Sequence, residues 1–112
     1  MRLEVKKYLF DIQHAAELVV RFTRGKDFTD YQQEPMLRLA VERALTIIGE
    51  ALSQLAKIDP DLAAQLQDYQ RIIAFRNVLI HAYAEVDDRI VWEVIQRKVP
   101  ALREQAADLL AQ

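Results

Sequence analysis

Three residue types are scarce in this 112-residue sequence, which has no cysteine, two glycines and three prolines. Without cysteine there is no disulfide framework, no zinc site built on thiolates and no catalytic thiol. The scarcity of glycine and proline argues against collagen-like, linker-like and turn-rich all-β proteins.

Long apolar runs, a leader-like N-terminus and a strong net charge are missing as well. No apolar run approaches the roughly 18 residues that a membrane span needs. The first residues, MRLEVKKYLFD, are charged where a signal peptide has an apolar core. We therefore expect a cytoplasmic protein that does not contact a membrane. The net charge of -2 argues against a globally basic nucleic-acid binder, so any contact with RNA has to come from a local basic patch.

The residues that are abundant favour helices. Hydrophobic residues make up 52% of the chain, and alanine and leucine, which are strong helix formers, dominate them. The length fits one domain over residues 1–112, long enough to bury a core without disulfides or metal. We expect an all-α fold, an antiparallel bundle of about four to five helices joined by short loops.

Apolar residues recur every three or four positions along several segments, the spacing of a helix with one buried face. The main helices are expected over residues 3–24, 34–58 and 68–83, from about 88 to Pro100, and after Pro100. The expected buried stripes include Val5, Tyr8, Ile12, Ala15, Val19 and Phe22 in the first helix and Ile90, Val91, Val94 and Ile95 in the fourth. A short helix is expected around Leu62 and Leu66. Gly25 is expected at the left-handed end of the first helix, and the polar residues 26–33 as a connector.

The residues that carry chemistry gather in one segment, RIIAFRNVLIHAY, over residues 71–83. At about 100° per residue, the core face of a helix here holds Ile72, Phe75, Leu79 and Ala82. Arg76 and Tyr83 fall within about 20° of each other beside that face. His81 lies about 140° from Arg76 and shares another face with Asn77, so one regular helix does not point Arg76 and His81 at one phosphate. Either the helix ends or distorts near His81, or two copies of the chain combine their residues across a two-fold axis; we favour the second, alone or together with the first.

The charge of Arg76 also needs a partner. Because an unpaired buried charge is very costly, an arginine set among apolar neighbours requires a carboxylate or a wet interface. Glu42 and Glu50, in the preceding helix, are the candidate carboxylates. The sequence does not choose between them.

This segment resembles the signature of a known family. The pattern Arg76-Asn77-x-x-x-His81-x-Tyr83 is similar to the Arg-x4-His-x-Tyr signature of the HepT toxins, which belong to the HEPN superfamily (higher eukaryotes and prokaryotes nucleotide-binding). Further similarity covers VERA and IIGEA at residues 41–44 and 47–51, and VD and VWEVI at residues 86–87 and 91–95. The family often has Pro-Trp before the helix of the motif, where this chain has Asp68-Tyr69-Gln70.

The resemblance implies an HEPN-like bundle that acts as a homodimeric, metal-independent endoribonuclease. Histidine has an unperturbed pKa of about 6.5, which suits proton transfer, so His81 would take the proton of an RNA 2′-hydroxyl or protonate the 5′-oxygen leaving group. Arg76 would bind the phosphate and stabilise its transition state, Asn77 would orient His81 or bind a phosphate oxygen, and Arg71 would extend the positive cleft. The product would be a 2′,3′-cyclic phosphate. No metal-ligand spacing and no glycine-rich phosphate loop is present in the sequence, so neither a metal nor a cofactor is indicated.

The same resemblance implies regulation by a partner protein. HepT-type toxins are typically paired with a small nucleotidyltransferase antitoxin, which silences them by attaching adenylyl groups to the tyrosine of the motif. That tyrosine is Tyr83 in this chain. A nucleotide on Tyr83 would add negative charge and bulk beside Arg76 and His81, and would block the RNA phosphate.

Other interpretations of these residues stay open. The chain could be a non-catalytic helical dimer that binds nucleotides or the partner nucleotidyltransferase, or a plain helical adaptor in which Arg76 only pairs internally. His81 could be an ordinary residue near a helix C-terminus, where its charge is mildly favoured. Asn77 could form a local hydrogen bond, and Tyr83 could lie at the edge of the core.

Overall fold

The regular structure of the chain is helical, as the apolar periodicity predicts. The computed structural model describes the backbone of residues 1–112 and every side chain except that of Tyr83, and the part it describes contains no strand. The elements in chain order are α1 (Leu3–Thr23), α2 (Phe28–Gln33), α3 (Pro35–Ile58), α4 (Pro60–Ala63), α5 (Tyr69–His81), the 3₁₀ turn η1 (Tyr83–Glu85), α6 (Asp88–Arg97) and α7 (Val99–Ala111). The prediction of an all-α fold is therefore confirmed, with α1, α3, α5, α6 and α7 as the five main helices.

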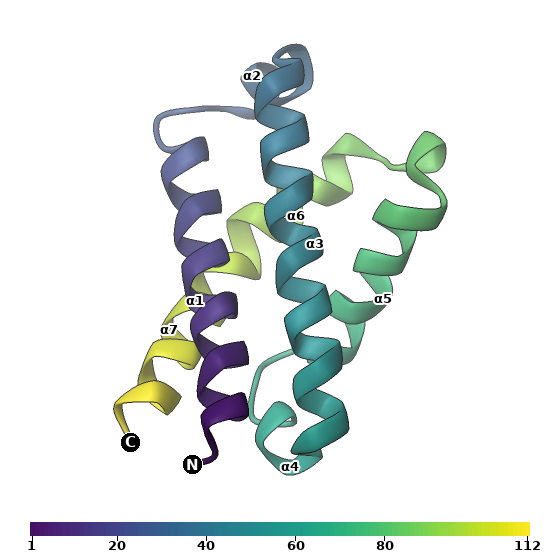
Figure 1. Cartoon of the computed structure of the whole chain (residues 1–112). Helices are drawn as coiled ribbons and strands as arrows, with labels where there is room; N and C mark the ends of the chain where they lie inside the picture. Colours follow the sequence, from purple (N-terminus) through teal and green to yellow (C-terminus); the bar gives the residue numbers. More distant parts are fainter.

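Helices α1 and α3 lie side by side at the centre of the bundle (Figure 1). Helix α7 packs on α1, and α5 packs on α3. The side chains that are fully buried between these helices include Leu9, Ile12, Val19, Val41, Ile48, Leu52, Leu55 and Leu102. Burial of such a side chain contributes about 1.5–3 kcal/mol, so the packing of α1 against α3 and α7 stabilises the bundle. None of the described helices is long and apolar enough along its length to cross a membrane.

The predicted connector at residues 26–33 is wrong, because residues 28–33 form the short helix α2. A capping box starts this helix: the Asp27 carboxylate accepts the backbone N–H of Asp30 at 2.8 Å, and the Asp30 carboxylate accepts that of Asp27 at 3.0 Å. These two bonds satisfy amides that the first helical turn leaves free. Tyr31 then anchors the helix, since its side chain is fully buried. The preceding Gly25 has a φ of 74°, which confirms the predicted left-handed end of α1.

Helix α5, which carries the predicted motif, is shorter than expected. It begins after Asp68, whose backbone is left-handed with a φ of 59°. It ends at His81, because Ala82 leaves the helical region with φ −136° and ψ 37°. The expected helix over residues 68–83 is therefore reduced by one residue at its start and two at its end. Pro100 lies in the first turn of α7 and separates it from α6, as predicted.

Candidate functional site

Arg76 lies on the side of α5 that packs against α3. The base of its side chain rests on Gly49, a buried residue of α3, and a Cβ placed on Gly49 would lie only 2.7 Å from the Arg76 Cγ. The Arg76 Nε is buried and has no hydrogen-bond partner among the described atoms. The ion pairs formed by the described side chains do not include Arg76 either. Arg76 as a whole is only half-buried, so its guanidinium, whose Nε lacks a partner, is suited to an anion from outside the described part of the chain.

The two carboxylates that were expected to pair with Arg76 face other parts of the molecule. Glu50 is exposed and borders a groove between α1 and α3. Glu42 is half-buried, and its burial and the nearby charge of Asp88 raise its pKa. Gly49 is the residue of α3 that faces Arg76, and Glu50, one position further along, points about 100° away from it. Neither candidate carboxylate forms an ion pair with Arg76 among the described side chains.

His81 and Asn77 lie on the exposed face of α5. His81 is the last residue of the helix, and Asn77 lies one turn before it. The helix is regular from Arg76 to His81, so the two side chains point about 140° apart. The helix does end at His81, which was one of the two arrangements left open by the sequence. Because the helix ends only after both residues, its end does not turn Arg76 and His81 of one chain toward each other.

Tyr83 and Arg71, the remaining predicted site residues, lie on either side of this stretch. The backbone of Tyr83 belongs to η1, but its side chain lies outside the described residues, so its role as a modification site stays a prediction. Arg71 is exposed on α5 and borders a groove between α5 and α6. The Arg71 side chain is thus accessible to a ligand in this groove, and its contribution to a positive cleft stays a prediction.

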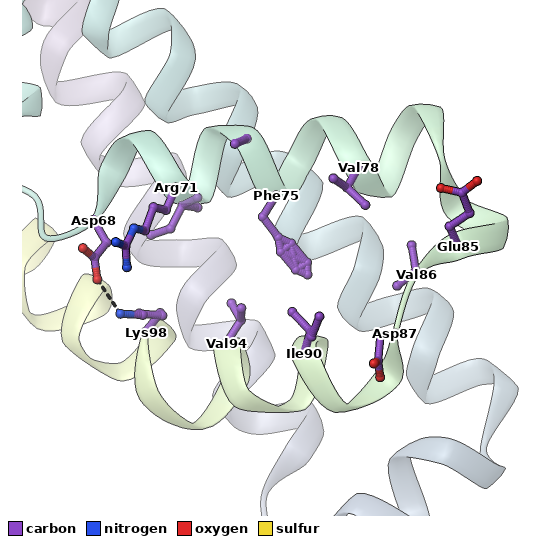
Figure 2. Close-up of a pocket in the computed structure, with 12 residues that line it drawn as sticks. Asp68, Arg71, Phe75, Val78, Glu85, Val86, Asp87, Ile90, Val94 and Lys98 are labelled. Atoms are coloured by element: carbon purple, nitrogen blue, oxygen red, sulfur yellow. Dashed lines mark hydrogen bonds and ion pairs between the residues drawn. The ribbon is translucent and has the colours of Figure 1, made fainter.

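An open apolar groove of about 380 Å³ separates α5 from α6. Figure 2 shows Phe75 pointing from α5 toward α6, with Ile90 and Val94 pointing back from α6. Asp68, Arg71 and Lys98 lie at one end of the groove, and Glu85 and Asp87 lie at the other. The groove thus has an apolar floor, an acidic pair at one end and, at the other, Arg71 beside the Lys98–Asp68 ion pair.

Sequence reasoning assigned part of this groove to the core. Phe75 was expected on the buried face of its helix but is only half-buried, and Ile90, expected in a buried stripe, is 57% exposed. Apolar spacing identifies one face of a helix without telling what covers it, so no signal in the pattern separates a groove from a core. Sequence reasoning also gave no role to Gly49, although a lone glycine inside a helical stripe is a signal for close helix approach.

Comparisons with known proteins cover nearly the whole chain. The family described as "Ribonuclease HepT-like" matches residues 12–109. The chain is 36% identical over 103 residues to "Probable ribonuclease HepT" of Thermococcus cleftensis, which is 92% of this chain and 93% of the relative. It is 33% identical over 104 residues to a "Putative RNase" of Methanocaldococcus jannaschii, with 91% and 93% covered. It is also 33% identical over 105 residues to a "Putative RNase" of Caldanaerobacter subterraneus, with 94% and 93% covered.

No solved structure matches the chain significantly. The family match includes α3 and α5, and with them Gly49, Arg76, Asn77 and His81. The sequence similarity and the all-α bundle lead to the same assignment. The chain belongs to the HepT-like ribonuclease family of the HEPN superfamily.

Proposed function

We propose that the protein is a metal-independent endoribonuclease that cuts RNA through Arg76 and His81. One observation carries the proposal: in a chain of the HepT-like ribonuclease family, Arg76 has no described partner for its Nε, while His81 on the same helix is exposed. An arginine with free donors binds a phosphate, and a histidine open to solvent exchanges protons with a substrate. Asn77 is exposed one turn before His81 and supports that histidine or the phosphate.

The chemistry needs only these side chains. A neutral His81 removes the proton from the RNA 2′-hydroxyl, and the 2′-oxygen attacks the adjacent phosphorus. The bond to the 5′-oxygen breaks, and that oxygen takes up a proton from water as it leaves. Arg76 stabilises the negative charge that gathers on the phosphoryl oxygens in the transition state. The products are a 2′,3′-cyclic phosphate and a 5′-hydroxyl.

A homodimer completes this site. Because Arg76 and His81 of one chain point about 140° apart, a two-fold axis is needed to bring Arg76 of one copy near His81 of the other. The open groove between α5 and α6 supports such an interface, since its apolar floor is exposed to solvent. A two-fold axis also exchanges the ends of the groove, so Arg71 of one copy would meet Glu85 and Asp87 of the other.

The regulatory part of the proposal is that the protein is the toxin of a toxin–antitoxin pair. A nucleotidyltransferase antitoxin would transfer an adenylyl group from ATP to the Tyr83 hydroxyl, with release of pyrophosphate and a proton, and any further group would be added to the nucleotide already attached. The motif places Tyr83 seven residues after Arg76, so the added phosphate would compete with RNA for the guanidinium.

Co-expression with the nucleotidyltransferase should raise the intact mass of the wild type by whole adenylyl units and leave the mass of Tyr83→Phe unchanged. An equal mass increase in Tyr83→Phe would exclude this site.

The catalytic proposal is tested by RNA cleavage in excess EDTA with protein whose intact mass shows no modification. The wild type should cut RNA and leave 2′,3′-cyclic phosphate ends. His81→Ala should lower kcat by about 10²–10⁴-fold, the usual contribution of a general acid or base. His14→Ala is the matched control, because His14 is the other histidine of the chain and stacks on Phe10 on α1. Loss of cleavage in EDTA, or equal activity of His81→Ala and wild type, would contradict the proposal.

A further inference from the structure

The contact between α3 and α5 at Arg76 depends on a residue without a side chain. A Cβ on Gly49 would collide with the Arg76 Cβ and would lie 2.7 Å from its Cγ and 3.5 Å from the Ile72 carbonyl oxygen. An ordinary carbon–carbon contact is about 3.5–4.0 Å, so the first two positions leave no room for a methyl group. Helix α5 therefore lies so close to α3 that its Arg76 side chain packs directly on backbone.

The backbone conformation of α3 does not explain this glycine. Gly49 lies inside a 24-residue α-helix, where alanine is a much better helix former than glycine. The other glycine of the chain, Gly25, differs in both respects: its φ of 74° suits glycine, and a Cβ on it would meet nothing within 4 Å. The feature that requires glycine at position 49 is the approach of Arg76.

The packing at Gly49 also fixes which part of Arg76 reaches solvent. The Cβ and Cγ are held against α3, and the Nε is buried. Arg76 as a whole is only half-buried, so its exposed part is the guanidinium end. The contact with Gly49 thus fixes the position of the Arg76 Cβ and Cγ, and with it the direction in which the guanidinium extends toward a phosphate.

We propose that Gly49 is a positioning residue for the reaction, because it lets α5 seat Arg76 where its guanidinium meets the RNA phosphate. The inference rests on the proposed function of Arg76. A methyl group on Gly49 would push the Arg76 Cβ away, and that atom is fixed to the α5 backbone and cannot rotate aside. The displacement needed is about 1 Å, and a shift of this size in a catalytic group costs about 100-fold in rate.

The kinetic test compares Gly49→Ala with wild type on a fluorogenic oligoribonucleotide that the wild type cuts. Gly49→Ala should lower kcat by about 100-fold and change KM by less than about threefold. The reason is that a displaced Arg76 weakens binding of the transition state more than binding of the substrate. Gly25→Ala is the matched control. It should lower Tm, because alanine is strained in the left-handed backbone conformation of residue 25. It should leave kcat unchanged, because a Cβ at this position would meet nothing within 4 Å. An unchanged kcat in Gly49→Ala would overturn the proposal.

A second measurement tests the contact without any assay of RNA cleavage. Gly49→Ala is introduced into wild type and into Arg76→Gly, which lacks the Cβ and Cγ, and Tm is measured for all four proteins. Helix propensity alone would raise Tm in both backgrounds, whereas the collision should lower it in wild type and be relieved in Arg76→Gly. If Gly49→Ala does not fold alone, the double variant should restore folding.

The two measurements separate the two proposals. The same Tm change in both backgrounds, or a double variant that stays unfolded, would overturn the role of Gly49. A wild type that cuts no RNA would instead overturn the proposed function, and the Tm comparison would still decide whether the contact exists.

Discussion

Lys98, directly after α6, donates a hydrogen bond to the carboxylate of Asp68, the residue directly before α5. Asp68 reaches this position in a left-handed backbone conformation. Elsewhere α5 and α6 face each other across the open groove (Figure 2). The ion pair therefore links the start of the motif helix directly to the α6–α7 junction.

This link should make stability depend on pH in acid. The hydrogen bond from Lys98 lowers the pKa of Asp68. A carboxylate with a lowered folded-state pKa stabilises the fold above its unfolded pKa, about 3.9, and this contribution is lost as the pH falls through the folded value. Asp68→Asn keeps a residue that tolerates a left-handed backbone, so its Tm should be slightly below that of wild type at neutral pH and equal to it in strong acid. Thermal unfolding between about pH 7 and pH 2 checks this.

Asp11→Asn is the matched control for the loss of one carboxylate. It breaks the exposed Lys7–Asp11 pair, which is 3.0 Å long and lies within α1. Exposed pairs of this kind contribute little, so its effect on Tm should be the smaller one. A Tm difference between Asp68→Asn and wild type that does not change with pH would show that the charge of Asp68 is not responsible.

Tyr31 carries a buried hydroxyl with no described hydrogen-bond partner. Burial, with the nearby charges of Glu42 and Asp88, raises the pKa of Tyr31 above its ordinary range. A buried donor without a partner costs about 1–3 kcal/mol, so Tyr31→Phe should leave the free energy of unfolding unchanged or raise it by about 1 kcal/mol. Urea unfolding measures this change. A clear loss of stability would mean that the hydroxyl is bonded in solution.

The groove between α5 and α6 should be the dimer interface. Ile90 is 57% exposed on its floor, so Ile90→Asp should fold normally but place a charge in the interface and separate the subunits. Leu39→Asp is the matched control, because Leu39 is 68% exposed and does not line the groove. Light scattering at micromolar concentration should find dimers for wild type and Leu39→Asp and monomers for Ile90→Asp. A monomeric wild type, or a dimeric Ile90→Asp, would exclude this interface.

Arg76→Lys tests whether the planar fork of the guanidinium is needed. Lysine keeps the charge but not the paired donors, and a lost transition-state donor typically costs about 10²–10³-fold in kcat. We expect a loss of that size in RNA cleavage with little change in Tm, because the described side chains offer Arg76 no ion pair to lose. A large fall in Tm with kcat preserved would make Arg76 a structural residue.

The central helices could be predicted from the sequence because several independent signals coincide there. Helices α1 and α3 were predicted to within one residue at each end, from their apolar stripes, from Gly25 and from Pro35 in the first turn of α3. Helix α2 was missed, since its polar residues carry no stripe and its stability comes from the Asp27–Asp30 capping box and one buried tyrosine.

The candidate site was less accessible to prediction, because it depends on how helices face one another. The angular separation of Arg76 and His81 follows from helix geometry alone. The residue of α3 that meets Arg76 does not, since it depends on the rotation of two helices about their axes. Two glutamates of α3 were therefore considered as partners, and the residue in contact is Gly49. In the same way, spacing alone could not show that Ile90 faces an open groove.

The most direct test of the shared site mixes two inactive variants. Arg76→Ala and His81→Ala are each purified, mixed in equal amounts, exchanged through mild denaturant and assayed for RNA cleavage in EDTA. If each site takes Arg76 from one copy and His81 from the other, half of the dimers are mixed and each has one intact site, so about a quarter of the wild-type activity should return. A mixture that forms mixed dimers but stays inactive would contradict the account.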